Sequence, residues 1–240
     1  MTGRVAIVLP VYNPDETRLP ALVRRLRADF AHIVVVDDGS TRGRAAFDAI
    51  YGTVDVVLSH RSNRGKGAAL KTAFAWVMEN LPKAIGVVTA DGDGQHAPED
   101  VRRVAEELER SPDGGLVLGV RSFGSDVPFR SRLGNIWTRT LFRLLTGLAV
   151  SDTQTGLRGI PASLLLRMLA IPGERYEYET RMLADARFHP APPREVPIKT
   201  IYLDGNSASH YRPLTDTLLT QSALWGSVFS HRRAAGAMEA

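Results

Sequence analysis

The segment Asp91-Gly92-Asp93-Gly94-Gln95-His96 carries the clearest chemical potential in this chain. Two carboxylates stand two residues apart and an amide oxygen follows, so the segment offers hard oxygen ligands that suit Mg²⁺ or Mn²⁺ rather than zinc. The glycines allow a tight turn and the close approach of a diphosphate. A cation held there would bridge two phosphates and offset charge on a leaving group. The alternative is a solvated acidic turn, with His96 in a structural role.

Two further segments could bind a nucleotide. Asp37-Asp38-Gly39-Ser40 can accept hydrogen bonds from a nucleobase or ribose, or can cap the segment that follows. Asn63-Arg64-Gly65-Lys66-Gly67 precedes a predicted helix, and exposed amides at a helix start can bind phosphate. The second segment lacks the glycine spacing of a P-loop, so a plain helix-start role stays open.

Positive charge is concentrated in one stretch of the chain. Five arginines and a single acid, Asp126, lie between positions 121 and 143, so the stretch sums to +4, which equals the net charge of the whole chain (30 basic and 26 acidic residues). A local excess favours an anionic ligand or a membrane surface over general nucleic-acid binding. A solvated arginine-rich helix face is the alternative. The arginines are Arg121, Arg130, Arg132, Arg139 and Arg143.

The elements that must position these residues alternate regularly. Apolar runs predict strands at 5–9, 33–36, 54–59, 84–89 and 115–120, and helical spacing predicts helices at 19–30, 44–51, 68–78 and 98–109. This alternation predicts a mostly parallel sheet with helices on both faces, in which ligands bind beyond the carboxyl ends of the strands. The polar pairs Tyr12-Asn13, Asp37-Asp38 and Asp91-Asp93 follow the first, second and fourth strands, so we expect them to converge on one rim.

After residue 120 the pattern changes. A helix at 135–148 would place its arginines on one face and Trp137, Leu141, Leu144, Leu145 and Leu148 on another. Such a basic amphipathic helix can lie on an anionic membrane surface, or it can pack its apolar face on the sheet. A helix at 178–186, a strand at 196–202 and a closing helix at 214–229 follow. We expect one domain over residues 1–216, with a C-terminal helix and tail over residues 217–240.

Composition excludes several classes of protein. The chain has 240 residues, of which 44% are hydrophobic and 23% charged, as in ordinary soluble domains. It has no cysteine, which excludes disulfides, thiolate metal sites and a cysteine nucleophile. The longest run without a charged residue or histidine, 217–230, is 14 residues, shorter than the ~20 of a membrane span. The N-terminus lacks a signal-peptide pattern, and we predict a cytoplasmic protein.

Taken together, the motifs resemble a known family. Pro10-Val11-Tyr12-Asn13, Val34-Val35-Val36-Asp37-Asp38-Gly39-Ser40 and the two segments at 63–67 and 91–96 occur in this order at the predicted strand ends. This set resembles the family 2 glycosyltransferases, which have the GT-A fold. Gly119-Val120-Arg121 and Asp152-Thr153-Gln154-Thr155-Gly156-Leu157-Arg158 look like the group that transfers mannose or glucose to dolichol or other polyprenyl phosphates. The likeness covers about residues 5–216.

The resemblance implies a role for each matching residue. The nucleotide sugar would lie against Pro10, Tyr12, Asp38, Asp91 and Gly92. Asp91, Asp93 and Gln95 would hold the Mg²⁺ or Mn²⁺, with Asp93 and Gln95 favoured over Asp91 as direct ligands. Arg121 and Arg130 would bind the acceptor phosphate, with Arg132 close enough to share that role, because guanidinium and phosphate pair in bidentate fashion.

The implied reaction is inverting transfer of a sugar from a nucleoside-diphosphate sugar to a polyprenyl phosphate. The acceptor phosphate is already anionic, so it needs no protein base, and positioning and electrostatics would carry catalysis. A UDP-sugar is slightly favoured, and GDP-mannose remains possible. We expect peripheral contact with the inner face of the cell membrane, no nucleic-acid partner and a possible homodimer.

Other readings stay open. A family 2 enzyme that acts on a soluble or saccharide hydroxyl would need a carboxylate base, for which Asp152 is the candidate. A non-catalytic sugar-nucleotide-binding protein is a second alternative, disfavoured by the intact Asp91, Asp93 and Gln95. A nucleotidyltransferase would need a glycine-rich basic loop after the first strand, where this chain has Tyr12-Asn13-Pro14. Pro14 also replaces the glutamate usual in the family, and Asp15 or Glu16 could take its place only if the loop shifts.

Overall fold

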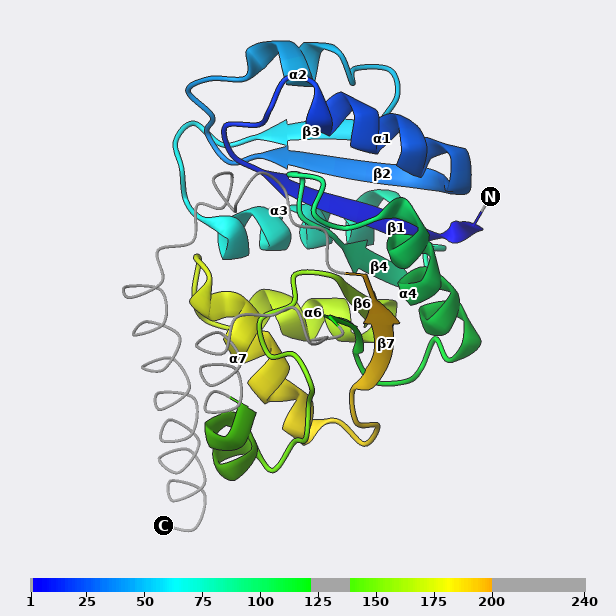
Figure 1. The fold of residues 1–240 in the computed structure, drawn as a ribbon, viewed down its shortest axis with the longest axis vertical. Coiled ribbons are helices and arrows are strands. Elements are labelled where there is room, and N and C mark those ends of the chain that lie inside the picture. Colours follow the sequence, from blue (N-terminus) through cyan, green and yellow to red (C-terminus); the bar gives the residue numbers. More distant parts are fainter. Residues whose placement is uncertain (1, 122–138, 200–240) are drawn as a thin grey trace.

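The computed structural model describes residues 2–121 and 139–199 of the chain. Strands and helices alternate along most of it (Figure 1). Its strands are β1 (Thr2–Val11), β2 (Phe30–Asp37), β3 (Val56–Ser59), β4 (Gly86–Thr89), β5 (Val117–Arg121), β6 (Arg158–Pro161) and β7 (Arg194–Ile198). Its helices are α1 (Arg18–Asp29), α2 (Arg44–Asp48), α3 (Lys66–Asn80), α4 (Pro98–Arg110), α6 (Ala162–Ala170), α7 (Glu177–Asp185) and the short 3-10 helix η1 (Ala186–Phe188), and residues 139–146 are also helical.

The strands form one seven-stranded sheet in the order β3-β2-β1-β4-β6-β5-β7. β1 pairs in parallel with β2 and β4, β2 pairs in parallel with β3, and β5 pairs in parallel with β7. β6 is antiparallel to both neighbours, β4 and β5. The carboxyl ends of β1, β2 and β4 therefore meet at one rim, as the alternating pattern predicts.

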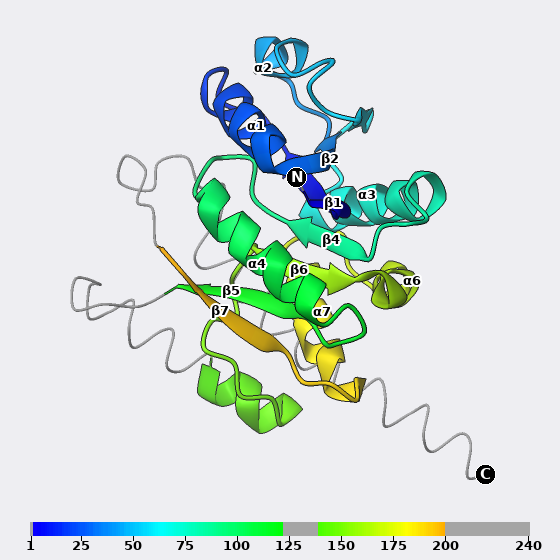
Figure 2. The same cartoon turned by 90° about the vertical axis from the view of Figure 1, so that its right-hand side faces the viewer.

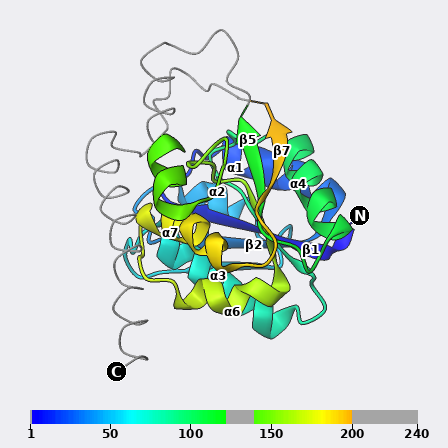
Figure 3. The same ribbon diagram turned by 90° about the horizontal axis from the view of Figure 1, so that it is seen from below.

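Helices cover both faces of the sheet, and side-chain alternation along the strands explains why. In β1, Val5, Ile7 and Leu9 join a core under α1, α2 and α4, whereas Ala6 and Val8 join a core under α3, α6 and α7. Figure 2 shows α1 and α4 on one side of the strands and α3 and α6 on the other, and Figure 3 shows the same layers from below. Both faces of β1 are buried, as a continuous apolar strand requires.

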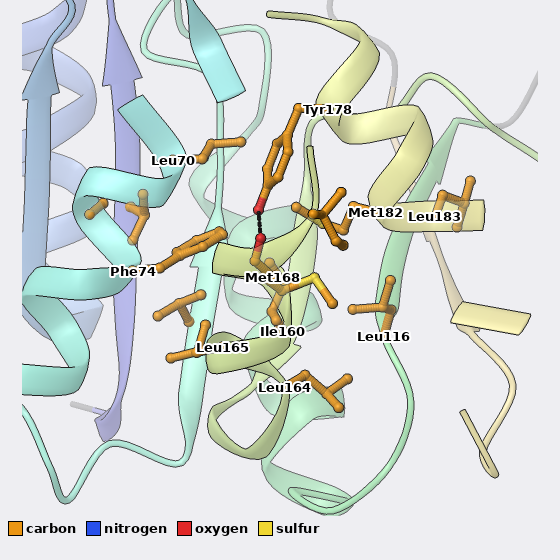
Figure 4. Close-up of a cluster of buried hydrophobic side chains, with 14 of the residues drawn as sticks. Leu70, Phe74, Leu116, Ile160, Leu164, Leu165, Met168, Tyr178, Met182 and Leu183 are labelled. Carbon is orange, nitrogen blue, oxygen red and sulfur yellow. Dashed lines mark hydrogen bonds between the residues drawn. The ribbon is translucent and has the colours of Figure 1, made fainter. Parts of the chain in front are cut away.

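The second of these cores contains Tyr178 of α7 (Figure 4). Its ring is fully buried among apolar side chains, and its hydroxyl donates a hydrogen bond to the Met168 carbonyl at 2.9 Å. This contact ties α7 to the end of α6. The core therefore fixes α7, which supplies a side chain to the site described below.

The structure departs from the sequence-based expectations in four places. β6 and α6 are not among the expected elements: β6 has only four residues, with Gly159 inside it and Pro161 at its end, so it carries no strand-like pattern. α2 ends at Asp48 rather than at residue 51. Leu144 is 78% exposed, so it does not belong to the apolar face predicted for the helix at 135–148, and Phe142 is buried there instead. The strand predicted at 196–202 begins earlier, at Arg194.

Candidate active site

The loops after β1 and β2 are joined at the rim of the sheet. The backbone N–H of Asn13 donates to Oγ of Ser40 at 2.8 Å, and the side-chain Oδ1 of Asn13 accepts from the backbone N–H of Thr41 at 2.9 Å. Asn13 has a φ of 51°, in the left-handed region that asparagine tolerates better than most residues. The loops after β1 and β2, which the family resemblance assigns to the nucleotide, therefore form one unit. Pro10 lies at the end of β1, and the half-buried Tyr12 follows directly after that strand.

Asp15 determines how this loop enters α1. Oδ1 of Asp15 accepts hydrogen bonds from the N–H groups of Thr17 and Arg18, both at 2.9 Å. The hydrogen bond from the Thr17 hydroxyl and these two backbone bonds lower the pKa of Asp15 to about 2. Asp15 thus caps the start of α1, which is a structural role. Its replacement of the missing family glutamate stays a prediction.

Asp38 is buried, and four donors surround its carboxylate. They are Nδ1 of His60 at 2.7 Å, Nδ2 of Asn63 at 2.9 Å, and the backbone N–H groups of Arg64 at 2.9 Å and Gly65 at 2.7 Å. Asp38 therefore organises the loop that leads into α3, whereas the capping of the segment that follows is done by Asp37, which accepts from the backbone N–H of Ser40 at 2.8 Å. The direct nucleotide contact that the family resemblance implies for Asp38 stays a prediction.

The same loop delivers Lys66, the first residue of α3, to the carboxylate segment. Nζ of Lys66 lies 2.6 Å from Oδ1 of Asp91 and 2.9 Å from Oε1 of Glu179, which comes from α7. Burial alone would lower the pKa of Lys66, but the two carboxylates raise it well above its ordinary value. Burial raises the pKa of Asp91, yet Lys66 and His96 outweigh that effect and hold it low. Asp91 is thus an ionised carboxylate that already faces a cation.

Asp93 is in the opposite electrostatic situation. Burial and the negative charge of Asp91 raise the pKa of Asp93 above its ordinary value. Its Oδ1 accepts one hydrogen bond, from the backbone N–H of Gln95 at 2.9 Å. Nε2 of Gln95 is buried and has no hydrogen-bond partner in the structure. The segment thus concentrates negative charge that a cation would relieve.

The oxygen donors of this segment fit Mg²⁺ or Mn²⁺. Asp91, Asp93 and Gln95 offer carboxylate and amide oxygens only. Over residues 2–121 and 139–199, no three His, Cys, Asp or Glu side chains are grouped as metal ligands. If Asp91, Asp93 and Gln95 held the ion, they would supply two carboxylates and one amide oxygen, and the remaining positions would go to water or to ligand oxygens, the usual arrangement for Mg²⁺ with phosphates.

Two glycines let neighbouring segments approach the carboxylates. A side-chain carbon at Gly92 would lie 2.7 Å from Cγ2 of Val11, so the segment fits closely against the end of β1. One at Gly156 would lie 2.7 Å from Oδ2 of Asp91 and 2.8 Å from Nζ of Lys66. Gly156 is held there because its carbonyl accepts a hydrogen bond from the hydroxyl of Thr89 at 2.9 Å. The loop before β6 therefore covers the Lys66–Asp91 ion pair.

Arg121, at the end of β5, contacts Asp152 in the loop before β6. Its Nε lies 2.7 Å from Oδ2 of Asp152, and its Nη2 lies 3.1 Å from Oδ1. Oδ1 of Asp152 also accepts from the backbone N–H of Gln154 at 3.0 Å, and Asp152 is 1% exposed. Both oxygens of Asp152 are therefore engaged. Arg130 and Arg132, the other predicted acceptor-phosphate residues, lie outside the described ranges.

A basic surface adjoins this part of the fold. Arg139 and Arg143 are exposed on the helix at 139–146 and line a cavity of about 270 Å³ together with Ser151 and neighbouring residues. Leu144 is exposed on the same helix, while Phe142 packs into the core. The helix thus packs one apolar side on the body of the protein and leaves arginines and a leucine outside. Within 2–121 and 139–199, no helix combines the length and apolarity needed to cross a bilayer.

The sequence pointed to the segment 176–179 as one that could shape the sugar and acceptor pockets, without singling out Glu179. It gave Lys66 only a general phosphate or helix-start role. The stretch Tyr176-Glu177-Tyr178-Glu179 places two glutamates in the first turn of α7, and only packing decides which one faces inward. Tyr178 fixes that choice because its ring enters the core. A basic residue at the start of α3 and a polar rim at β4 were the signals available for the Lys66–Asp91 pair.

Comparison with known proteins agrees with this architecture. The model of the glycosyl transferase family 2 matches residues 6–169. The UDP-N-acetylglucosamine–dolichyl-phosphate N-acetylglucosaminyltransferase of Methanococcus voltae is 28% identical over 232 residues, covering 85% of this chain and 88% of the relative. The polyprenol monophosphomannose synthase of Mycolicibacterium smegmatis is 32% identical over 167 residues, covering 65% of this chain and 61% of the relative.

A solved structure shares the fold. Glucosyl-3-phosphoglycerate synthase from Mycobacterium tuberculosis, solved with Mn²⁺, uridine-diphosphate-glucose and phosphoglyceric acid, superposes with a TM-score of 0.70 at 19% identity, over 95% of this chain and 80% of that one. The seven-stranded sheet with helices on both faces is thus the GT-A fold that the motifs suggested. With a family model that spans most of the chain and a rim built from the expected motifs, this protein belongs to glycosyl transferase family 2.

Proposed function

We propose that this protein transfers a sugar from a nucleoside-diphosphate sugar to a polyprenyl phosphate, with inversion at the anomeric carbon. The engagement of Asp152 carries the choice of acceptor. A hydroxyl acceptor needs a carboxylate base within hydrogen-bond reach, but the predicted base is buried with both oxygens hydrogen-bonded to Arg121 and Gln154. A phosphate acceptor is already anionic and requires no such base. The family membership and the lipid-phosphate acceptor named for the Methanococcus voltae relative support the same choice.

The reaction needs few groups from the protein. An acceptor phosphate oxygen attacks the anomeric carbon, the bond from that carbon to the diphosphate oxygen breaks, and the nucleoside diphosphate leaves with the bonding electrons. Pro10, Tyr12, Asp38 and Gly92 are the residues we assign to nucleotide-sugar binding at the joined loops. Arg121 is assigned to orient the acceptor phosphate, with Arg130 and Arg132 as further predicted contacts. Rate enhancement would come from alignment and charge placement.

Asp91, Asp93 and Gln95 would hold the Mg²⁺ or Mn²⁺. When bound, such an ion supplies positive charge beside the diphosphate that departs. Burial and the negative charge of Asp91 raise the pKa of Asp93, and a cation beside the two carboxylates would oppose the second of these effects. A UDP-sugar is our first choice of donor and GDP-mannose the second.

We also propose that the protein contacts the inner face of the cell membrane from the cytoplasm. The exposed Arg139, Arg143 and Leu144 support this assignment, because basic and apolar side chains together favour an anionic bilayer surface. A lipid phosphate presented at that surface would lie on the same side of the fold as the cavity that these arginines line.

A panel of donors and acceptors tests the proposal. UDP- and GDP-sugars are each incubated with Mn²⁺ and with undecaprenyl phosphate, undecaprenol or free saccharides. We expect a lipid-linked product from one donor with undecaprenyl phosphate only. Transfer to undecaprenol or to a saccharide, without a lipid phosphate product, would overturn the assignment and would return Asp152 to consideration as a base.

A further inference from the structure

The ammonium of Lys66 lies between two carboxylates from different parts of the chain. Asp91 Oδ1 is at 2.6 Å and Glu179 Oε1 at 2.9 Å, and the side chains of Lys66 and Glu179 are 14% and 11% exposed. Asp91 is one of the residues assigned to the divalent cation. One of its oxygens is therefore occupied by the protein's own cation before any ion arrives.

The position of Lys66 is firmly built. The backbone just before it is held by hydrogen bonds from Arg64 N–H and Gly65 N–H to Asp38. Gly156, in the loop before β6, has no side chain, and this leaves room beneath that loop for Nζ of Lys66 and for the carboxylate of Asp91. The ion pair is thus partly buried, with the Lys66 side chain 14% and the Asp91 side chain 31% exposed, and its freedom is restricted compared with a surface pair whose two side chains are mobile.

Glu179 gives Lys66 a second partner. A buried ammonium without a counter-charge is costly. If Lys66 were paired with Asp91 alone, transferring Asp91 to a divalent cation would leave that ammonium uncompensated. With Glu179 in contact, Lys66 keeps one carboxylate while Asp91 turns to the ion.

We propose that Lys66 is a positioning residue that competes with the divalent cation for Asp91, and that Glu179 sets the strength of this competition by holding Lys66 when Asp91 is released. The inference rests on the proposed function only in assigning the cation to Asp91 and Asp93. It predicts opposite effects for two neighbouring charges: removal of Lys66 strengthens cation binding, and removal of the Glu179 charge weakens it.

Mn²⁺ binding without nucleotide measures this competition directly. Free Mn²⁺ is followed by electron paramagnetic resonance in titrations of the wild type, Lys66→Met, Glu179→Gln and the double variant. Lys71→Met is the matched control, since Lys71 lies on the same helix but donates to the Gly173 carbonyl at 3.0 Å. The double variant removes both charges of the pair, so it leaves no unpaired buried carboxylate at Glu179 if Lys66→Met alone folds poorly. Circular dichroism verifies the fold of each variant.

We expect Lys66→Met and the double variant to bind Mn²⁺ about tenfold more tightly. An opposite charge within ~4–6 Å lowers the pKa of a carboxylate by about one to three units, and we expect the same charge to lower the affinity of that carboxylate for a cation by a comparable factor. Glu179→Gln should bind Mn²⁺ more weakly, and Lys71→Met as the wild type does. Unchanged or weaker binding in the folded variants without Lys66, or binding to none of these proteins, would overturn the inference. Failure of the proposed function would be visible separately, as a wild type that forms no lipid-linked sugar whatever its Mn²⁺ affinity.

Discussion

Arg121 and Asp152 form a bidentate ion pair at the end of β5. Nε of Arg121 lies 2.7 Å from Oδ2 of Asp152, and Nη2 lies 3.1 Å from Oδ1. One residue was predicted to bind the acceptor phosphate, and the other was the candidate base for a hydroxyl acceptor. The two residues on which the choice between a phosphate acceptor and a hydroxyl acceptor depends are therefore paired with each other. Asp152 orients the guanidinium, and the guanidinium removes Asp152 from use as a base.

Asp152→Asn should therefore impair use of the acceptor more than use of the donor. The change removes the charge that aligns Arg121, and hydrogen bonds to charged groups contribute ~1.5–3 kcal/mol, or about ten- to hundredfold in kcat/KM for the lipid phosphate. Steady-state kinetics with each substrate varied in turn measure the effect, with the exposed Asp113→Asn as control. A fall in kcat with unchanged KM for the acceptor would instead indicate a base.

Gly156→Ala should disrupt the carboxylate segment. The new methyl carbon would lie 2.7 Å from Oδ2 of Asp91 and 2.8 Å from Nζ of Lys66, so the ion pair or the covering loop must move. Overpacking of this kind costs ~1–3 kcal/mol. We expect loss of most sugar transfer and a lower urea midpoint. Gly3→Ala, which meets nothing within 4 Å, should leave both unchanged, and a fully active Gly156→Ala enzyme would contradict the described geometry.

Asp38→Ala should destabilise the protein more than Asp37→Ala does. Loss of the Asp38 carboxylate leaves His60, Asn63 and two backbone N–H groups without their buried acceptor. The expected cost is ~3–5 kcal/mol in the free energy of unfolding, the scale for breaking a buried charged network. The carboxylate of Asp37 accepts a hydrogen bond from the backbone N–H of Ser40, so the loss of this carboxylate should cost ~0.5–1.5 kcal/mol. Equal urea unfolding curves for the two variants would count against a structural role for Asp38.

Tyr178→Phe isolates one hydrogen bond between α6 and α7 (Figure 4). The variant keeps the buried ring but removes the donor to the Met168 carbonyl. We expect a loss of ~1–1.5 kcal/mol, which lowers Tm by roughly 2–6 °C in a domain of this size. Tyr51→Phe, at a site that is 54% exposed, should not change Tm. A Tm equal to that of the wild type in Tyr178→Phe would show that the bond contributes no net stability.

Much of this architecture follows from local patterns. The runs of β-branched residues at β1, β2 and β4 and the helical spacing between them were sufficient to predict parallel strands with a polar rim. β6 escaped prediction because four residues with Gly159 among them have no periodicity, and its place between β4 and β5 depends on long-range pairing. The inward choice of Glu179 over Glu177 and the burial of Phe142 rather than Leu144 likewise depend on packing between distant segments.

In the site, too, local features could be predicted from the sequence and contacts between distant residues could not. The Asp91–Gln95 segment could be recognised because its ligand chemistry lies within a few residues. The pairing of Arg121 with Asp152 and of Lys66 with Asp91 and Glu179 joins residues 25 to 113 positions apart, which no local pattern reveals. At Asp38 the motif left two roles open, nucleotide binding and capping, and it did not reveal the four internal donors from which this carboxylate accepts hydrogen bonds.

Metal dependence of lipid-linked sugar formation tests the central claim most directly. Wild type and Asp93→Asn are assayed with undecaprenyl phosphate and the preferred donor, first after EDTA treatment and then with Mg²⁺ or Mn²⁺ restored. The account predicts that EDTA abolishes the lipid product, that either ion restores it in the wild type, and that folded Asp93→Asn stays inactive under all conditions. A lipid product that forms equally well in EDTA, or a fully active Asp93→Asn enzyme, would contradict it.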